Sequence, residues 1–224
     1  MRLTEIQAPA VTDKDYEFMN DHVPLLEEHC SEIIREIVAA KKLLYRGEQD
    51  KYSTMVRTIW TNRKSLYMPD DFAYIIEEAY TKLGISANRQ NSIFTTPSTQ
   101  VANAWGQAYI VFPVNGYKFS YFTEVTQGEY AFDALHALLD TLFGYKLDTL
   151  PKDKFKTNSE VRQLFNDEFV KKVVKQLKGL GITDTDLQYA MNHDCEVLFT
   201  GTEYYSFKGS EWVLPIRKWL NEIK

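Results

Sequence analysis

The sequence predicts an α+β fold, and three observations lead to that prediction. Helical spacing of apolar residues fills an early segment, strand-like apolar runs then alternate with further helical patterns, and 44% of the 224 residues are hydrophobic. This composition excludes intrinsic disorder and is sufficient for a hydrophobic core. No internal repeat or domain boundary is visible. We therefore predict one domain over residues 1–224, with residues 1–41 as an N-terminal helical extension and residues 43–207 as its core.

Local signals define the elements of the first half of the chain. Asn20 or Asp21 can cap the first helix and Pro24 suits its first turn, while Gly47 and Gly84 are natural stops. The apolar stripe of that helix consists of Leu26, Cys30, Ile33, Ile34 and Ile37. The predicted elements of this half are a helix over 22–41, a strand over 43–46, a helix over 70–83, a strand over 92–96 and a short helix from the Ser98 cap to Trp105.

The second half is predicted in the same way. Asn115-Gly116 stands between two strand patterns and predicts a β-hairpin. Thr183 with Asp186 predicts a capping arrangement for a short helix that runs to Met191. The other predicted elements are strands over 108–113 and 117–122, helices over 130–143 and 159–178 with a loop over 146–158 between them, strands over 195–199 and 204–207, and a closing helix over 215–223.

Charge and composition exclude several classes of function. The net charge of −5 comes from 26 basic and 31 acidic residues, which argues against a strong nucleic-acid footprint. No apolar run approaches the roughly 18 residues of a membrane span, so we expect a cytoplasmic protein with no membrane partner. Cys30 and Cys195 lack a CxxC spacing, which predicts reduced thiols. No metal site is expected from the spacing of the four histidines, His22, His29, His136 and His193.

Three short segments carry side chains suited to chemistry. Arg46 ends a predicted buried strand in Tyr45-Arg46-Gly47, and its planar guanidinium suits either a surface carboxylate or a phosphate. The hydroxyls of Thr95-Thr96-Pro97-Ser98 precede a short helix and act either as a cap or in orienting a ligand. Asp194 and Glu196 stand two apart at the start of a predicted strand, so we expect them to project from one face, either solvated or used in catalysis.

The order of these segments resembles the mono-ADP-ribosyltransferase superfamily of the R-S-E type. That family has an early arginine, an aromatic-x-Ser-Thr-Ser strand and a strand that starts with Glu-x-Glu or Gln-x-Glu. The best match is Glu196-Val197-Leu198-Phe199, followed by a turn and Tyr204-Tyr205. The run 94–105 with 109–116 is similar to the serine strand, its helix and the next strand. The resemblance spans residues 43–207.

The resemblance implies a split pair of small antiparallel β-sheets around an NAD cleft, with packed helices, and NAD as the substrate. Glu196 would bond the ribose next to nicotinamide and stabilise positive charge as nicotinamide departs, and Asp194 would position the acceptor. The residues that the resemblance assigns to NAD binding are Arg46, Gly47, Thr95, Thr96, Ser98 and Tyr109. For stacking on nicotinamide the candidates are Trp105, Tyr109 and Tyr121, each of which also suits core packing.

The chain departs from the family at two points. Thr95-Thr96-Pro97-Ser98 replaces Ser-Thr-Ser, and Asp194 replaces the first glutamate with a carboxylate one methylene shorter. The acceptor therefore stays open between a protein side chain, a nucleic acid and water. Flanking residues also resemble a group of uncharacterised tailed-phage proteins that share this layout, which implies a viral protein that acts in the host cytoplasm. These residues are Arg57, Arg63-Lys64, Pro69-Asp70-Asp71 and Arg89.

Three hypotheses for function follow. The first is an NAD-dependent ADP-ribosyltransferase, or an NAD glycohydrolase where water is the acceptor. The second is a non-enzymatic phage module, binding or virion-associated, that keeps the fold without the activity. The third is a carboxylate-pair hydrolase acting on nucleotides or sugars through Asp194, Glu196 or Glu203.

Overall fold

The structure is a computed structural model that describes residues 12–49, 55–61, 70–125, 137 and 167–223. Its strands are β1 (Tyr45–Glu48), β2 (Val56–Thr58), β3 (Ile93–Thr95), β4 (Gln107–Pro113), β5 (Lys118–Phe122), β6 (Ile182–Thr183), β7 (Val197–Thr200) and β8 (Glu203–Lys208). Its helices are α1 (Asp13–Glu17), the π-helix η1 (Phe18–His22), α2 (Val23–His29), α3 (Ser31–Ala40), α4 (Asp70–Leu83), α5 (Thr99–Trp105), α8 (Asp167–Gly179), α9 (Leu187–Asn192) and α10 (Gly209–Glu222).

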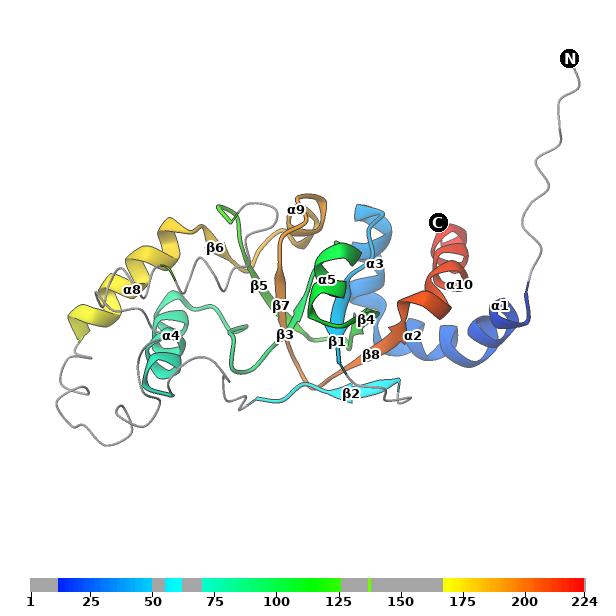
Figure 1. Cartoon of the computed structure of the whole chain (residues 1–224), viewed down its shortest axis with the longest axis horizontal. Coiled ribbons are helices and arrows are strands. Elements are labelled where there is room, and N and C mark those ends of the chain that lie inside the picture. Colours follow the sequence, from blue (N-terminus) through cyan, green and yellow to red (C-terminus); the bar gives the residue numbers. More distant parts are fainter. Residues whose placement is uncertain (1–11, 50–54, 62–69, 126–136, 138–166, 224) are drawn as a thin grey trace, which may run out of the picture.

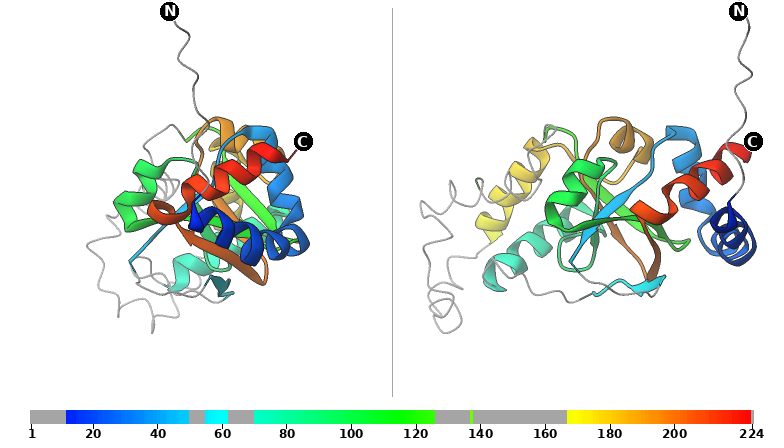
Figure 2. Two further views of the ribbon diagram at one scale, coloured as in Figure 1. Left: turned by 90° about the vertical axis from the view of Figure 1, so that its right-hand side faces the viewer. Right: turned by 45° about the vertical axis from the view of Figure 1, so that its right-hand side comes forward.

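These elements form an α+β fold built on two small antiparallel sheets, which confirms the α+β class and the pair of antiparallel sheets. The described strands pair in the orders β1-β4-β8-β2 and β3-β7-β5-β6. We call the first sheet A and the second sheet B. In Figures 1 and 2 the sheets occupy the middle of the molecule, with α4 and α8 at one end and α1, α2 and α10 at the other.

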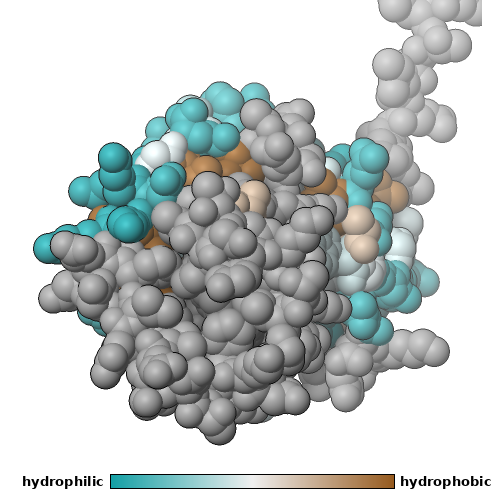
Figure 3. Space-filling view, turned by 60° about the vertical axis from the view of Figure 1, so that its left-hand side comes forward, coloured by the Kyte–Doolittle hydropathy of each residue, from teal (hydrophilic) through white to brown (hydrophobic). Residues whose placement is uncertain are grey.

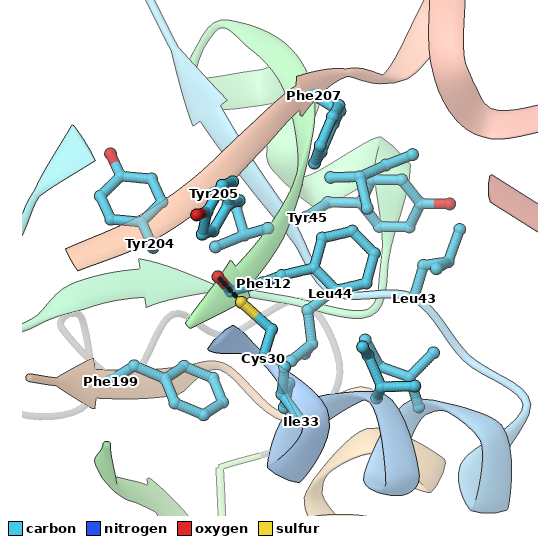
Figure 4. Close-up of a cluster of buried hydrophobic side chains, with 14 of the residues drawn as sticks. Cys30, Ile33, Leu43, Leu44, Tyr45, Phe112, Phe199, Tyr204, Tyr205 and Phe207 are labelled. Carbon is cyan, nitrogen blue, oxygen red and sulfur yellow. Dashed lines mark hydrogen bonds between the residues drawn. The ribbon is translucent and has the colours of Figure 1, made fainter. Parts of the chain in front are cut away.

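The predicted apolar stripe of the first helical region lies in the core. Leu26, Cys30, Ile33, Ile34 and Ile37 are all buried, as predicted. They belong to one cluster with Phe112 and Phe207 of sheet A and Phe199 of sheet B (Figure 4). The Cys30 thiol donates to the Phe112 carbonyl at 3.5 Å. This helical region thus covers apolar side chains of both sheets.

The helical region begins earlier than predicted and is broken. Thr12 caps α1, and a capping box joins its side chain and backbone to Asp15. The chain then passes through η1 and α2 before a break at Cys30, and Pro24 lies in the first turn of α2. The predicted cap at Asn20 or Asp21 is wrong, because both residues lie inside the π-helix.

The predicted β-hairpin at Asn115-Gly116 is also wrong. β4 and β5, which flank this turn, belong to different sheets. The turn is bonded instead to the start of α3: the Asn115 side-chain oxygen accepts from the Glu32 N–H at 2.9 Å, and the Gly116 N–H donates to the Glu32 carboxylate at 3.0 Å. β7 and β8 are likewise adjacent in sequence and lie in different sheets. Both turns therefore carry the chain from one sheet to the other.

Most other elements match their predictions, with shifted ends. Helix α4 has the predicted bounds and ends at Gly84, and Ser98 caps α5. Gly47 lies inside β1 rather than ending it, because β1 continues to Glu48. The side chain of Asp186 caps α9, whereas Thr183 belongs to β6.

The remaining segments differ from the prediction or lie outside the described residues. The closing helix begins at Gly209 and holds Pro215 in its interior. β2 was not predicted. The helix 130–143, the loop 146–158 and the part of the helix 159–178 before Asp167 lie outside the described residues, apart from residue 137.

Among the coloured residues of the face in Figure 3, hydrophilic side chains lie beside smaller areas of hydrophobic ones. Among the helices in the described ranges, none combines the length and the hydropathy that crossing a membrane requires.

Candidate functional site

Strand β3 brings the three chemistry-bearing segments together. Tyr45 of β1 and Thr96, which follows β3, exchange two backbone hydrogen bonds of 2.8 Å each. On its other side β3 pairs with β7, so that Thr95 stands opposite Val197. Arg46 follows Tyr45 and Glu196 precedes Val197. Residues far apart in the sequence thus lie on neighbouring segments where sheet A meets sheet B (Figure 1).

The arginine end of the site is a buried charge cluster. The Arg46 Nε lies 3.3 Å from Oε1 of Glu48, and an Arg57 guanidinium nitrogen pairs with Oε2 of the same carboxylate. The Tyr204 hydroxyl donates to Glu48 Oε1 at 3.2 Å. The Arg57 guanidinium also lies over the Tyr109 ring, 5.3 Å from its centre. We call these five residues the Glu48 cluster.

The registers of sheet A explain why the members of this cluster meet. Arg46 stands opposite Tyr109 in the β1–β4 pair, and Arg57 stands opposite Tyr204 in the β2–β8 pair. Directly opposed residues lie on the same face of the sheet, and so do residues two apart on one strand. Glu48 stands two residues after Arg46 on β1 and therefore lies on the same face. The side chains of Arg46, Glu48 and Arg57 are only 19%, 5% and 16% exposed.

The cluster carries one net positive charge, because two guanidinium groups face one carboxylate. Burial raises the pKa of Tyr204, Arg46 and Arg57 act to lower it, and the Glu48 charge and hydrogen bond act to raise it. Tyr204 therefore stays protonated and is a donor to Glu48. Guanidinium groups in a largely covered site are donors that suit an anionic group.

The hydroxyl segment is tied into the local structure. The Thr95 hydroxyl donates to the Val197 carbonyl at 3.1 Å, which links β3 to β7. The Thr96 hydroxyl accepts from the Ser98 N–H at 3.2 Å, and the Ser98 hydroxyl accepts from the Val101 N–H at 3.3 Å at the start of α5. These bonds fix the strand end and the helix cap. A role of the three hydroxyls toward a ligand stays a prediction.

The two carboxylates of the acidic segment engage different partners. The Asp194 carboxylate lies 2.7 Å from Nζ of Lys42, which also donates to the Asn192 carbonyl at 3.1 Å. Glu196 is half-buried and its charge acts on the buried phenol of Tyr80 in α4. Burial raises the pKa of Tyr80, the Arg89 charge lowers it and the Glu196 charge raises it further.

Strand alternation therefore does not govern Asp194 and Glu196. The prediction of a strand from Cys195 is wrong by two residues, since β7 starts at Val197. Asp194 also has a left-handed backbone, with φ of 55°, at the end of the turn that follows α9. The prediction that both carboxylates project from one face of a strand therefore does not apply, because neither residue lies in β7.

Phe94 links the two ends of the site. Arg46 donates to the Phe94 carbonyl at 3.3 Å, and the Arg89 guanidinium lies 5.1 Å from the centre of the Phe94 ring. Phe94 thus contacts both Arg46 and Arg89, and the Arg89 and Glu196 charges both affect the pKa of Tyr80. Glu48 and Tyr80 were missed as site residues. The Arg-x-Glu spacing of β1 could have indicated Glu48, but no local pattern indicates Tyr80.

The aromatic candidates for stacking differ in exposure. Tyr109 and Tyr121 are buried, and the Tyr121 hydroxyl donates to the Asp186 carbonyl at 3.2 Å. Trp105, at the end of α5, is 49% exposed. A Cβ atom added to Gly47 would meet the Ala102 carbonyl oxygen, so this glycine allows α5 to lie directly against β1.

Comparisons of the chain with protein-family models, curated proteins and solved structures found no match. In the ranges that the structure describes, no three His, Cys, Asp or Glu side chains are grouped so that they could hold a metal ion. The interpretation of the site therefore depends on its own geometry and chemistry.

Proposed function

We propose that the protein binds NAD at the junction of β1, β3 and β7 and breaks the bond between nicotinamide and ribose. ADP-ribose then passes to an acceptor or to water. The observation that carries this proposal is the pairing of β3 with both neighbours, which brings Arg46, the Thr95-Thr96 hydroxyls and Glu196 onto adjacent segments. In this proposal the two sheets have the arrangement of an ADP-ribosyltransferase, with the NAD cleft between them.

The Glu48 cluster supports a phosphate-binding role for Arg46. A diphosphate is anionic and offers oxygens to a planar guanidinium, which donates several hydrogen bonds in a fixed geometry. The cluster supplies that guanidinium and limits its access to water. Electrostatic attraction is stronger in such a covered site than in bulk water.

Glu196 supports the chemical step. The bond from ribose C1 to the nicotinamide nitrogen breaks, nicotinamide leaves with the electron pair as a neutral molecule, and positive charge develops on the ribose. The acceptor then forms a bond to C1 and loses a proton. A carboxylate beside the ribose is more stabilising in this transition state than in the ground state. Half-burial of Glu196 favours such an interaction, since the carboxylate is only partly screened by water.

The Lys42–Asp194 pair bears on the acceptor. An Asp194 carboxylate bonded to Lys42 at 2.7 Å has less capacity to hold a cationic acceptor. This favours a neutral acceptor, with water the simplest case. A viral source and action in the host cytoplasm are part of the proposal and depend on the resemblance alone.

Release of nicotinamide from NAD tests the proposal. Wild-type protein is compared with Glu196→Gln, which keeps the side chain's size and removes its charge. We expect the substitution to slow release by about a hundredfold or more, the order found when one transition-state contact is removed. Glu203→Gln is the matched control, because Glu203 is an exposed carboxylate at the start of β8. This variant should release nicotinamide at the wild-type rate. Equal rates for Glu196→Gln and wild type contradict the proposal.

A second candidate is a binding module without turnover, and the Lys42–Asp194 pair favours it. If Asp194 stays paired with Lys42 and no acceptor, water included, is activated beside it, the site binds NAD and transfers nothing. A calorimetric titration that detects NAD binding, together with no nicotinamide release by the wild type, supports this reading over the enzyme. No NAD binding at millimolar concentration contradicts both.

A further inference from the structure

We propose that Glu48 is a positioning residue that holds the Arg46 guanidinium in the orientation that binds the phosphates of NAD. This inference depends on the proposed function and extends it to a residue that no motif of the sequence identified. Glu48 is not expected to touch NAD itself. Its role is to fix the residue that does.

The contacts of Glu48 leave its carboxylate little freedom. Oε1 accepts from the Tyr204 hydroxyl at 3.2 Å and lies 3.3 Å from Arg46 Nε, while Oε2 pairs with Arg57. These partners come from three different strands of sheet A, namely β8, β1 and β2. Only 5% of the Glu48 side chain is exposed. A carboxylate held from three strands is a rigid anchor for a guanidinium.

Arg46 is then held at two points. Its Nε faces Glu48, and one Nη donates to the Phe94 carbonyl of β3. Nε and one terminal nitrogen are thus directed to the protein, and a guanidinium carries five N–H donors in all. In this proposal the remaining donors bind the phosphates of NAD. An arginine that is ordered before the ligand arrives does not lose side-chain freedom when it binds.

The role of Glu48 could instead be simple neutralisation, and the two roles predict opposite effects. If Glu48 only lowers the positive charge, its neutral analogue raises the local charge and NAD binds more tightly. If Glu48 positions Arg46, the analogue frees the guanidinium and binding weakens. In Glu48→Gln one oxygen becomes an NH2 group, which cannot accept from arginine. The Arg46 guanidinium then loses one of its two holding points and is expected to become more mobile.

Steady-state kinetics of nicotinamide release distinguishes these roles. For Glu48→Gln we expect the KM for NAD to rise about tenfold, the order set by ordering one mobile arginine on binding. The kcat should stay within about threefold of wild type, because a loss of uniform binding raises KM alone. In an Arg46→Gln background the same substitution should change KM by less than about twofold, since both act through one guanidinium.

Asp15→Asn is the matched control for losing a buried ion pair. Asp15 is buried in α1 and lies 2.6 Å from Lys218 of α10, so its replacement disturbs a similar pair formed by other elements. Its KM for NAD should equal that of wild type. A cooperative thermal unfolding transition shows that a variant is folded. If Glu48→Gln does not fold, Tyr204→Phe replaces it, because this change removes one hydrogen bond to Glu48 and should raise KM about threefold.

The outcomes separate this inference from the proposed function. If wild-type protein neither binds NAD nor releases nicotinamide, the proposed function fails and this inference fails with it. A second outcome is that wild type is active and Arg46→Gln raises KM, but folded Glu48→Gln has the wild-type KM or a lower one. That outcome overturns the positioning role alone. Tyr204→Phe takes the place of Glu48→Gln if the latter does not fold. A higher KM for Glu48→Gln that is lost in the Arg46→Gln background supports the positioning role.

Discussion

The two ends of the site are built differently. At the arginine end, Glu48 is bonded from three strands, and two guanidinium groups are fixed on one carboxylate. At the acidic end, Asp194 pairs with Lys42, and the Glu196 charge raises the pKa of Tyr80. In the proposed function, the pre-organised arginine end serves binding and Glu196 at the acidic end serves the chemical step. Substitutions at the two ends should therefore have separable effects.

The largest effect at the binding end is expected from Arg46→Gln. It removes the guanidinium that donates to Phe94 and faces Glu48. Hydrogen bonds to charged groups contribute about 1.5–3 kcal/mol, so NAD affinity should fall roughly ten- to a hundredfold. Calorimetric titration with NAD measures this loss. Unchanged affinity in a folded variant would remove Arg46 from the binding end.

The next effect concerns the packing behind Arg46. A Cβ at Gly47 would meet the Ala102 carbonyl oxygen and the Trp105 Cβ, so Gly47→Ala should separate α5 from β1. We expect a loss of about 1–3 kcal/mol in the free energy of unfolding, the usual cost of overpacking. Gly179→Ala is the control, because no atom lies within 4 Å of its added Cβ. Denaturant unfolding compares them, and equal stability of both variants would contradict the close packing of α5 on β1.

A smaller effect is expected from Asp194→Asn. The Lys42 and Asp194 side chains are 34% and 30% exposed, and exposed ion pairs contribute about 0–1 kcal/mol. The variant should unfold near the wild-type midpoint and release nicotinamide within about threefold of the wild-type rate, because the transition state is stabilised by Glu196. A loss as large as that of Glu196→Gln would show that the acidic end acts as a pair after all.

The smallest effect concerns the dependence of stability on pH, away from both ends. Burial lowers the pKa of His22 from its usual 6.5, against the charges of Asp21 and Glu17, which raise it. The folded state therefore favours neutral His22. Its contribution to stability is complete above pH 6.5 and is lost as pH falls toward the lowered pKa. Between pH 7.5 and pH 5 the free energy of unfolding should decline less in His22→Gln than in wild type, by the contribution of one titrating group. Equal declines would show that His22 does not titrate in this way.

Short-range patterns predicted much of the fold. The buried stripe from Leu26 to Ile37, the bounds of α4 and the Ser98 cap were predicted because spacing and capping are local properties. Pairing between strands was not local. Asn115-Gly116 has the composition of a hairpin turn, but its bonds to Glu32 of α3 direct β4 and β5 into different sheets.

In the site, too, local features were predictable and non-local contacts were not. Arg46 and Glu196 could be selected from the sequence because each stands in a recognisable segment. The partners that define their surroundings could not, since Arg57 and Tyr204 reach Glu48 only through the registers of β2 and β8. Asp194 was expected to act beside Glu196, but its left-handed backbone and its bond to Lys42 depend on the turn after α9.

In the proposed function, one end of the site binds NAD and the other acts on it. The most direct test is a calorimetric titration of Glu196→Gln with NAD, followed by an assay of nicotinamide in the same sample. We expect binding at an affinity within about threefold of wild type, with nicotinamide release slowed about a hundredfold. Loss of NAD binding in this folded variant, or nicotinamide release at the wild-type rate, would contradict the proposed function.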